Sequence, residues 1–368
     1  MSDQPSSKIP SNAQGVRDED AFDVTAMAAW LRHNAAEPIC TDGTIDGTPE
    51  VRQFVGGASN LTYLLSYAGR DFILRRPPGG TKAKGAHDMP REHNLQAALK
   101  PVYPYVPTMV ALCEDEAVIG STFYVMERVE GTILRTDIPP GLGLDEAGIR
   151  RLCETAIDRL ADLHDVDVEA AGLAHLSRGE GYVARQVGGW NERYRRARTP
   201  DVDPLEDVMG WLDAHQPPDA GMCLIHNDFR FDNMVLDAED PTRIRALLDW
   251  ELATVGDPLM DLAGALAYWV QADDDPRRIA LRLQPTHATG MLTRHEVVAA
   301  YGQRTGRTIA SEDWTFYEVF GLFRLAVIGQ QIYYRFFHGQ TTNAAYGRFG
   351  EMVRYLGTTC QRILQGAP

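Results

Sequence analysis

The apolar residues of this chain follow two patterns in two stretches, and this change limits the folds that it can adopt. Between residues 51 and 127 they form short β-rich runs separated by turn-forming residues. We expect strands at 51–55, 61–67 and 71–76, and two more around a turn near Asp115. Beyond residue 145 they recur at helical spacing, as at Ile149, Leu152 and Leu160. The pattern predicts an α+β protein, with a five-stranded antiparallel sheet before a mainly helical part.

The same change of pattern predicts how the chain divides into domains. We expect a polar, disordered leader at 1–20, a sheet-rich N-terminal lobe at 21–131 and a helical C-terminal lobe at 132–368, with a hinge at 127–131. The segment MPREHNLQAAL predicts one helix within the first lobe. A cleft between two such lobes is a common place for a ligand.

Two helix starts in the C-terminal lobe carry recognisable signals. Asp203 precedes Pro204, and Asp257 precedes Pro258. An aspartate at the N-cap followed by proline at the first helical position is a typical start. We therefore expect helices after both aspartates, and we interpret Asp257 as a cap rather than a metal ligand.

Composition and charge exclude several classes of protein. The chain is 44% apolar and 24% charged, as in an ordinary globular protein, and its net charge of -15 argues against unaided binding to nucleic acid or an anionic membrane. Its five cysteines are scattered, with no Cys-x-x-Cys pair, which is typical of reduced thiols rather than disulfides or a zinc site. No signal peptide or membrane span is evident. We expect a cytoplasmic protein, either a monomer or a homodimer.

The stretch CLIHNDFRFDNMVLD places a polar loop between two apolar runs. The loop contains His226, Asp228 and Asn233, and sixteen residues later Asp249 ends another apolar run. These strand ends can bring two carboxylates and an amide oxygen together, a set of ligands that suits Mg²⁺. Phosphoryl transfer needs such ligands, a carboxylate beside the attacking hydroxyl, and a cation on the phosphates of the donor.

Candidates for the phosphate-binding groups lie in the sheet-rich lobe. Arg75 ends the third strand, where protein kinases carry a lysine, and Glu92 follows seventeen residues later, within reach of it from the helix. The segment GGASNLT can cover phosphates with backbone N–H groups and small side chains. Its candidate nucleotide-binding residues are Gly57, Ser59, Asn60 and Thr62.

The order of these motifs resembles one known superfamily. The pattern His-x-Asp-x-x-x-x-Asn, then Asp-Trp, then Gly-Asp-Pro-x-x-Asp-Leu-Ala is that of the aminoglycoside phosphotransferase and choline kinase superfamily, which shares the bilobal protein-kinase fold. The resemblance runs from about residue 50 to 350. It is carried by His226, Asp228, Asn233, Asp249, Trp250, Gly256, Asp257, Pro258 and Asp261.

The resemblance implies a role for each residue of the site. Asp228 would be the catalytic base, Asn233 and Asp249 would hold Mg²⁺, and Asp261 would brace the catalytic loop. His226 would be structural, since the carboxylate acts as the base. Glu127 to Val129 would offer backbone groups to the base of ATP or GTP.

A narrower resemblance concerns the acceptor. The segments LRRPPGG, YVMERVEGTIL and YYRFFHG look like the kinase-like domain that occurs alone in bacteria and fused to some large acyl-CoA dehydrogenases. In that subgroup an arginine at position 75 is usual, and a hydroxyacyl-CoA is a possible acceptor. The residues Arg185, Trp190, Tyr194 and Tyr334 could line the acceptor site. A solvated amphipathic helix also explains the first three residues and is the preferred interpretation, and core packing is preferred for Tyr334.

Two other functions stay open. A pseudokinase or nucleotide-binding module is favoured by Arg75 in place of lysine and by the lack of a Gly-x-Gly-x-x-Gly loop, although Asp228, Asn233 and Asp249 are all present. A true aminoglycoside phosphotransferase is the other alternative. A metallohydrolase is disfavoured because no second histidine lies near His226 in the sequence. The sequence therefore predicts a small-molecule kinase that uses ATP or GTP with Mg²⁺ and a hydroxyl acceptor.

Overall fold

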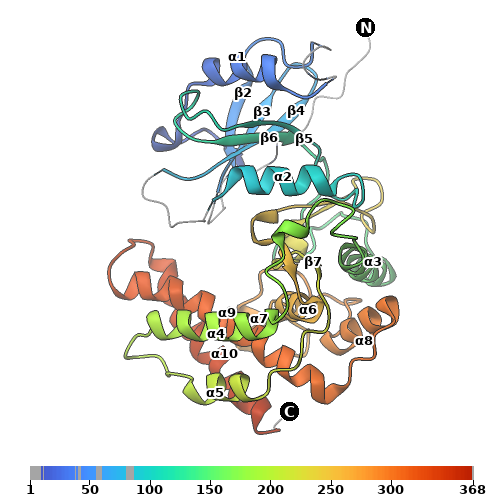
Figure 1. Ribbon diagram of the computed structural model, residues 1–368, viewed down its shortest axis with the longest axis vertical. Coiled ribbons are helices and arrows are strands. Elements are labelled where there is room, and N and C mark those ends of the chain that lie inside the picture. The colour runs from blue at the N-terminus through green and yellow to red at the C-terminus, as the bar shows by residue number, and fades with distance from the viewer. Residues whose placement is uncertain are drawn as a thin grey trace. The chain divides into compact units, whose positions relative to one another are not determined.

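The computed structural model describes residues 10, 12–37, 39, 43–54, 60–79 and 87–366. The chain forms two compact units (Figure 1). The first unit comprises Met1–Glu130 and the short segment Ala246–Glu251, and the second comprises Gly131–Arg245 and Leu252–Pro368. The return of residues 246–251 to the first unit was not predicted from the sequence, and it places Asp249 in that unit.

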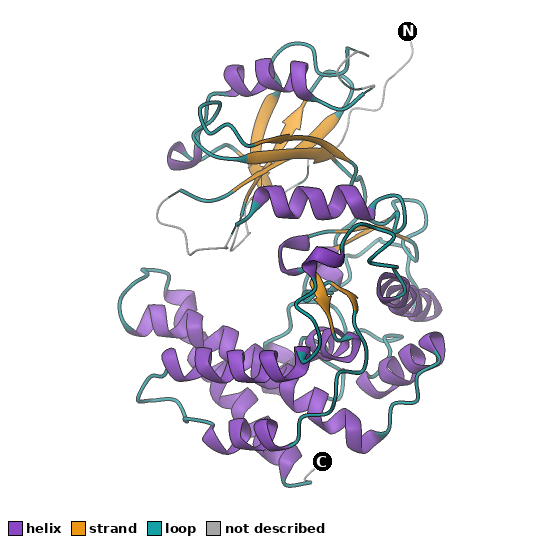
Figure 2. Ribbon diagram, viewed as in Figure 1, coloured by secondary structure: helices purple, strands orange, loops and turns teal. Residues whose placement is uncertain are grey.

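The first unit contains a six-stranded antiparallel sheet in the order β1-β2-β3-β4-β6-β5 (Figure 2). Its strands are β1 (Ala13–Gln14), β2 (Glu50–Phe54), β3 (Leu61–Ser66), β4 (Asp71–Arg76), β5 (Met109–Cys113) and β6 (Phe123–Glu127). Five of them lie where the β-rich runs predicted them. β1 is the additional strand, so the predicted count of five was one too low.

The predicted disordered leader is wrong for residues 13–20. Ala13 and Gln14 pair with β2, and Asp18–Asp20 form a single 3-10 turn. The buried carbonyl oxygen of Asp20 accepts hydrogen bonds from the Tyr63 hydroxyl at 2.8 Å and from Arg76 Nη2 at 2.6 Å. This polar segment is ordered because strands β3 and β4 carry buried polar partners for it, which composition alone does not reveal.

Two helices accompany the sheet, α1 (Val24–Asn34) and α2 (Met89–Leu99). α1 packs Met27 and Leu31 against the sheet in the main core of this unit. α2 begins after Asp88, whose side chain accepts the Arg91 N–H at 3.0 Å. Its buried face carries Glu92 beside apolar residues, so the sheet and α2 bury one carboxylate between them.

The second unit is mainly helical, as predicted. Its helices are α3 (Glu146–His164), α4 (Tyr182–Arg196), α5 (Glu206–Ala214), α6 (Pro258–Ala267), α7 (Pro276–Ala280), α8 (Arg294–Thr305), α9 (Ser311–Phe337) and α10 (Phe349–Leu364). Single 3-10 turns lie at Ala174–Leu176, Phe231–Asn233 and Ala344–Arg348. A further turn, Trp250–Leu252, begins in the segment that belongs to the first unit. The long helix α9 packs against α4, α5, α6 and α10 and forms the centre of this unit (Figure 1).

Four short strands accompany these helices. β7 (Cys223–Ile225) pairs antiparallel with β10 (Thr254–Gly256), while β8 (Met234–Leu236) is followed by β9 (Ile244–Leu247). Backbone hydrogen bonds between Thr132 and Leu236 anchor β8 to the start of the unit. Gly131 has φ +156°, and a Cβ atom there would lie 2.0 Å from the Leu236 carbonyl oxygen, so this approach requires glycine.

One predicted helix start is confirmed and the other is wrong. Asp257 caps α6, and its Oδ1 accepts the N–H groups of Leu259 at 2.8 Å and Met260 at 3.0 Å. α5 instead begins after Leu205, a buried residue in the left-handed region with φ +51°. The backbone carbonyl of Asp203 accepts a hydrogen bond from the Tyr194 hydroxyl at 2.6 Å. Asp203 therefore holds the segment before α5 without serving as its N-cap.

None of the described helices has both the length and the hydropathy that crossing a lipid bilayer requires. The four described cysteines, Cys113, Cys153, Cys223 and Cys360, are buried free thiols.

Candidate active site

The residues predicted for the site lie in two groups, one in each unit. The group in the second unit is the loop between β7 and β8, which contains His226, Asp228 and Asn233. The loop leaves β7 through Asn227, which has a positive φ of 65°. β7 itself is held by β10, where Gly256 is required because a Cβ atom would lie 2.5 Å from Ile225 Cδ1.

Asp261 on α6 fixes the entry to this loop. Its carboxylate accepts the backbone N–H groups of His226 at 2.8 Å and Asn227 at 2.7 Å, and it lies 3.2 Å from Nε2 of His164. His164 in turn contacts the Tyr301 hydroxyl at 2.7 Å. Burial disfavours the charge of Asp261, but its hydrogen bonds and the nearby histidines lower the pKa of this carboxyl below its ordinary value. Asp261 therefore makes the contacts that a brace of the loop requires.

His226 is fully buried and bonds within the loop. Its Nδ1 accepts the Asp228 N–H at 3.2 Å, so this nitrogen carries no proton in that arrangement. Its ring lies edge-on to Phe229, with centroids 6.3 Å apart. These contacts suit a residue that shapes the loop, which is the structural role implied for His226.

Asn233 holds the carboxylate of Asp228 in place. Its Nδ2 donates to both the carbonyl oxygen and Oδ2 of Asp228 at 2.9 Å. This orientation of the amide leaves Asn233 Oδ1 as a remaining acceptor. The proposed base and one proposed metal ligand are thus joined directly within the loop.

Arg230 is a residue of this loop that the sequence prediction missed. Its Nε lies 3.0 Å from Asp228 Oδ1, and its Nη2 lies 3.3 Å from Asp232 Oδ2. The guanidinium stacks on the Tyr268 ring at 4.5 Å. Burial disfavours its charge, but the two carboxylates outweigh burial and raise its pKa above the ordinary value. The one available signal was an arginine between two aspartates of the motif.

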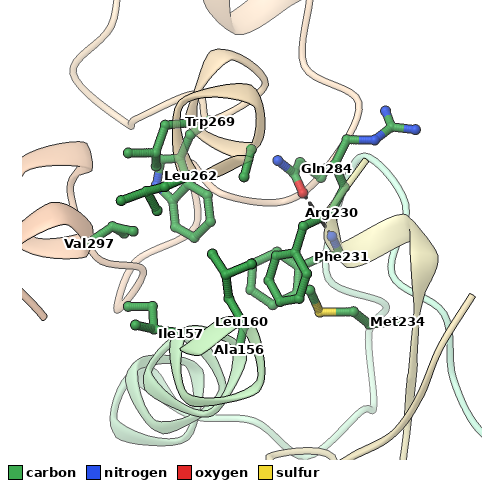
Figure 3. Close-up of a pocket in the computed structure, with 13 residues that line it drawn as sticks. Ala156, Ile157, Leu160, Arg230, Phe231, Met234, Leu262, Trp269, Gln284 and Val297 are labelled. Carbon is green, nitrogen blue, oxygen red and sulfur yellow. Dashed lines mark hydrogen bonds between the residues drawn. The ribbon is translucent and has the colours of Figure 1, made fainter. Parts of the chain in front are cut away.

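Gln284 also supports the loop and was missed. Its buried Oε1 accepts the Phe231 N–H at 2.9 Å, and its Nε2 donates to the Tyr268 carbonyl at 3.3 Å. Beside it lies a mostly apolar cavity of about 20 Å³, room for one water molecule, from which the Arg230 guanidinium points away (Figure 3). Gln284 lies in an irregular segment far along the chain, where no motif indicates it.

The group in the first unit is a buried ionic cluster around Arg75. Arg75 Nη1 donates to Glu92 Oε1 at 2.6 Å, and Nη2 donates to Asp249 Oδ1 at 3.0 Å. Glu92 Oε1 also accepts the Tyr124 hydroxyl at 2.8 Å. Burial raises the pKa of Glu92, while the neighbouring acids keep the pKa of Arg75 above its ordinary value. Glu92 thus contacts Arg75 from α2, as the sequence predicted.

Asp249 lies at the exposed side of this cluster. Its side chain is 32% exposed, compared with 9% for Arg75, and its φ is +67°. Such backbone strain in a non-glycine residue is frequent at functional sites. Trp250 anchors the segment, since it is fully buried and its Nε1 donates to the Leu247 carbonyl at 2.8 Å.

The other predicted nucleotide residues have mixed outcomes. Gly57 and Ser59 lie outside the described residues. Asn60 is buried, its Nδ2 donates to Glu251 Oε2 at 2.9 Å, and its Oδ1 lies 2.7 Å from His87 Nδ1. Thr62 is half-buried opposite Arg75 in the sheet.

The first residue of the predicted hinge, Glu127, already makes contacts within the first unit. The Glu127 N–H donates to the Thr108 carbonyl at 2.9 Å, and its carboxylate pairs with Arg70. Val129 is half-buried. The Arg128 N–H also donates, to the Asp71 carbonyl at 3.4 Å, so the N–H groups of Glu127 and Arg128 are both bonded within the first unit.

The predicted acceptor residues do not form one cluster. Tyr194 is buried and bonded to Asp203, so it is a core residue, contrary to its prediction as an acceptor residue. Arg185 donates to the backbone carbonyls of Gly179 and Glu180. The Tyr334 ring lies 4.2 Å from that of His338. Trp190 is half-buried and donates to Gln186 Oε1 at 3.1 Å.

Comparison with known proteins decides the family. A sequence profile of the phosphotransferase enzyme family matches residues 50–309. The chain belongs to this family. Acyl-CoA dehydrogenase family member 10 of Mus musculus is 36% identical over 309 residues, covering 83% of this chain and 28% of that protein. Family member 11 of Homo sapiens is 30% identical over 361 residues, covering 97% of this chain and 45% of that protein. The chain spans less than half the length of these relatives.

Solved structures of phosphotransferases share the fold. A protein from Ralstonia eutropha, named as a candidate aminoglycoside phosphotransferase, has a TM-score of 0.78 at 30% identity and covers 95% of this chain and 100% of that chain. Choline kinase from Cryptosporidium parvum has a TM-score of 0.60 at 11% identity and covers 94% of this chain and 96% of that chain. The predicted α+β kinase-like fold is confirmed.

Proposed function

We propose that the chain is a small-molecule kinase, which transfers the γ-phosphate of ATP or GTP to a hydroxyl group of its acceptor. The observation that supports this most is the fixed loop of the second unit, in which Asn233 holds the Asp228 carboxylate at 2.9 Å and Asp261 braces the loop entry. Phosphoryl transfer requires a positioned carboxylate beside the attacking hydroxyl, and this loop of a phosphotransferase-family chain provides one.

Asp228 would act as the general base. Its carboxylate accepts the proton of the acceptor hydroxyl, the oxygen forms a bond to the γ-phosphorus, and the bond to the leaving nucleoside diphosphate breaks. Arg230 forms an ion pair with the same carboxylate, and its Nη2 donates to Oδ2 at 3.3 Å, the oxygen that also accepts from Asn233. The proton then leaves to solvent when the product departs.

The two residues proposed as metal ligands each carry an oxygen donor of the kind that Mg²⁺ binds. The ion prefers oxygen ligands, and Asn233 presents Oδ1 while Asp249 has Oδ2 besides the oxygen bonded to Arg75. We propose that Asn233 and Asp249 hold the ion. When bound, Mg²⁺ supplies positive charge to the phosphates of the donor.

We further propose that Arg75 contacts the donor phosphates, as the lysine of protein kinases does, with Glu92 fixing its position. Gly57, Ser59, Asn60 and Thr62 would cover the phosphates. The hinge between Glu127 and Val129 would meet the nucleotide base. The structure of an aminoglycoside 2'-phosphotransferase-IIIa, whose fold is similar with a TM-score of 0.57, was determined with GDP. This keeps GTP beside ATP as a donor.

The acceptor that we favour is a hydroxyacyl-CoA, because the relatives found are named acyl-CoA dehydrogenase family members. An aminoglycoside is the alternative, since a fold neighbour was solved with GDP and kanamycin. We place the reaction in the cytoplasm, with the chain a monomer or homodimer. A nucleotide-binding module without transfer also stays open, because an arginine stands at position 75 and pairs with both Glu92 and Asp249.

A screen of nucleoside diphosphate release tests the proposal. The purified chain is incubated with Mg²⁺ and ATP or GTP, alone and with hydroxyacyl-CoAs, amino alcohols, sugars or aminoglycosides. Acceptor-dependent release with the wild-type chain, absent in Asp228→Asn, is the expected result. Release stimulated only by aminoglycosides would remove the hydroxyacyl-CoA assignment. Nucleotide binding without any stimulated release would leave the nucleotide-binding module.

A further inference from the structure

Arg324 is a buried arginine that lacks a carboxylate partner among the described residues. It lies on α9 and is 9% exposed, and its Nη2 donates to the Asn227 carbonyl at 2.8 Å. Its other recorded contact is with the Trp190 ring, whose centroid lies 5.4 Å from the guanidinium carbon. Two other buried arginines are paired, Arg75 with Glu92 and Arg278 with Asp274. Buried Arg76 also has no ion pair in the described part of the chain, but it donates to the Asp20 carbonyl and to the Tyr63 hydroxyl. Among the described residues, Arg324 therefore meets a carbonyl dipole and a ring face rather than a carboxylate.

A second cation shares the same ring. The Arg193 guanidinium lies 4.5 Å from the Trp190 centroid, and Arg193 is exposed without an ion pair in the described part of the chain. Its neighbours on α4 differ, because Arg195 pairs with Glu206 and Arg196 pairs with Glu192. Two unpaired guanidinium groups thus contact one tryptophan in a protein whose net charge is -15.

This arrangement is unusual on electrostatic grounds. A buried cation is costly unless an anion or strong hydrogen bonds compensate it. An aromatic face attracts a cation, but it does not neutralise its charge. Functional sites commonly leave a charge uncompensated so that a ligand of opposite charge can complete the set.

We propose that Arg324, Trp190 and Arg193 form an anion-binding subsite for the acceptor. Arg324 is bonded to the residue that precedes Asp228, so an anion held by it would lie near the base. The subsite would take an acceptor that carries a carboxylate or phosphate, with this anionic group held by the guanidinium groups of Arg324 and Arg193. The anion comes either from a free hydroxy acid or from the phosphates of a coenzyme A thioester. A polycation such as kanamycin would be repelled. This inference rests on the proposed kinase function.

Charge-matched probes test the subsite. Lactate and lactamide have nearly the same shape, and the amide replaces the charged carboxylate by a neutral group. Lactoyl-coenzyme A adds the phosphates, and kanamycin is the cationic probe. Each is titrated by calorimetry at millimolar concentration into the full chain saturated with Mg²⁺ and a non-hydrolysable ATP analogue. If the anion comes from a free hydroxy acid, we expect lactate to bind more tightly than lactamide. If it comes from a coenzyme A thioester, we expect lactoyl-coenzyme A to bind and lactate not to bind.

Three variants locate the binding. Arg193→Gln removes an exposed charge and should lower the affinity for the anionic probe that binds by about two- to fivefold. Arg324→Lys keeps the charge but loses the planar fork, and should weaken it about tenfold or more. The matched control Arg196→Gln, one helical turn away and paired with Glu192, should leave it unchanged. If Arg324→Lys fails to fold, Arg193→Gln against Arg196→Gln still decides the question.

Several results would overturn the subsite. Among the probes, the contradicting results are equal affinity for lactate and lactamide without binding of lactoyl-coenzyme A, binding of kanamycin alone, or no binding of any anionic probe. Among the variants, the contradicting result is an equal change of affinity in Arg193→Gln and Arg196→Gln. Failure of the kinase proposal gives a different result. In that case MgATP binding or acceptor-stimulated release is absent in the wild-type chain.

Discussion

Replacing Glu92 by alanine should lower the free energy of unfolding of the first unit by about 3–5 kcal/mol. Glu92 is 1% exposed, and its Oε1 accepts from both Arg75 at 2.6 Å and the Tyr124 hydroxyl at 2.8 Å. The truncation leaves the buried Arg75 with Asp249 alone, and that side chain is 32% exposed. It also leaves the Tyr124 hydroxyl without this acceptor. The loss is therefore that of a broken buried ion pair, not that of a surface contact.

Removing both charges should be less damaging than removing one. In Arg75→Met combined with Glu92→Leu no uncompensated charge remains buried, so the cost should be below about 2 kcal/mol. Glu116→Ala is the control, because Glu116 is exposed in a turn of the same unit and should change stability by less than about 0.5 kcal/mol.

Hydrogen exchange followed by mass spectrometry is the suitable assay, because the chain has two units and a single unfolding transition cannot be assumed. Peptides from β4 and α2 report the opening of the first unit, and peptides from α9 serve as an internal reference. A cost below about 1 kcal/mol for Glu92→Ala would refute the reasoning. So would a double variant that costs the sum of both single changes.

Three further predictions concern the site. Arg75→Ala should raise the nucleotide KM and lower kcat together in steady-state kinetics, and its effect should be less than additive with that of Glu92→Ala, whereas full additivity would contradict their pairing. Asp249→Asn should weaken Mg²⁺-dependent nucleotide binding in calorimetry, and unchanged affinity would exclude it as a ligand. The pKa of Asp261 is lower in the folded state than in the unfolded state, where it is about 3.9. Its charge therefore adds to the free energy of unfolding above that pH, and this contribution is lost as the pH falls through the folded pKa. Asp261→Asn should thus be destabilised at neutral pH, and its deficit in urea unfolding should shrink as the pH falls below about 4; a constant deficit would count against this.

Local patterns predicted most of the fold. Strands β2 to β6 and helix α2 lie where apolar alternation and helical spacing placed them, because each of these elements signals its own structure along the chain. The order of motifs also indicated the reach of Glu92 to Arg75, since both residues come from such elements.

The features that the sequence did not predict depend on partners far away in the chain. The backbone carbonyl of Asp20 is bonded by Tyr63 and Arg76, and α5 begins after the buried Leu205 rather than after Asp203. Gln284 reaches the Phe231 N–H from a segment without periodic pattern. Tyr194 was a candidate for the acceptor site, but it is buried and bonded to the Asp203 carbonyl. Side-chain pairing at long range carries no local signal.

Turnover of Asp228→Asn tests the central claim most directly. The substitution keeps the size of the side chain and removes the carboxylate that accepts the hydroxyl proton, so metal and nucleotide binding should persist in calorimetry. Transfer of radiolabelled γ-phosphate to the acceptor found in the screen should fall by about 10²–10⁴-fold relative to the wild-type chain. Transfer by Asp228→Asn at the wild-type rate would contradict the account, because the proposed chemistry begins at that carboxylate.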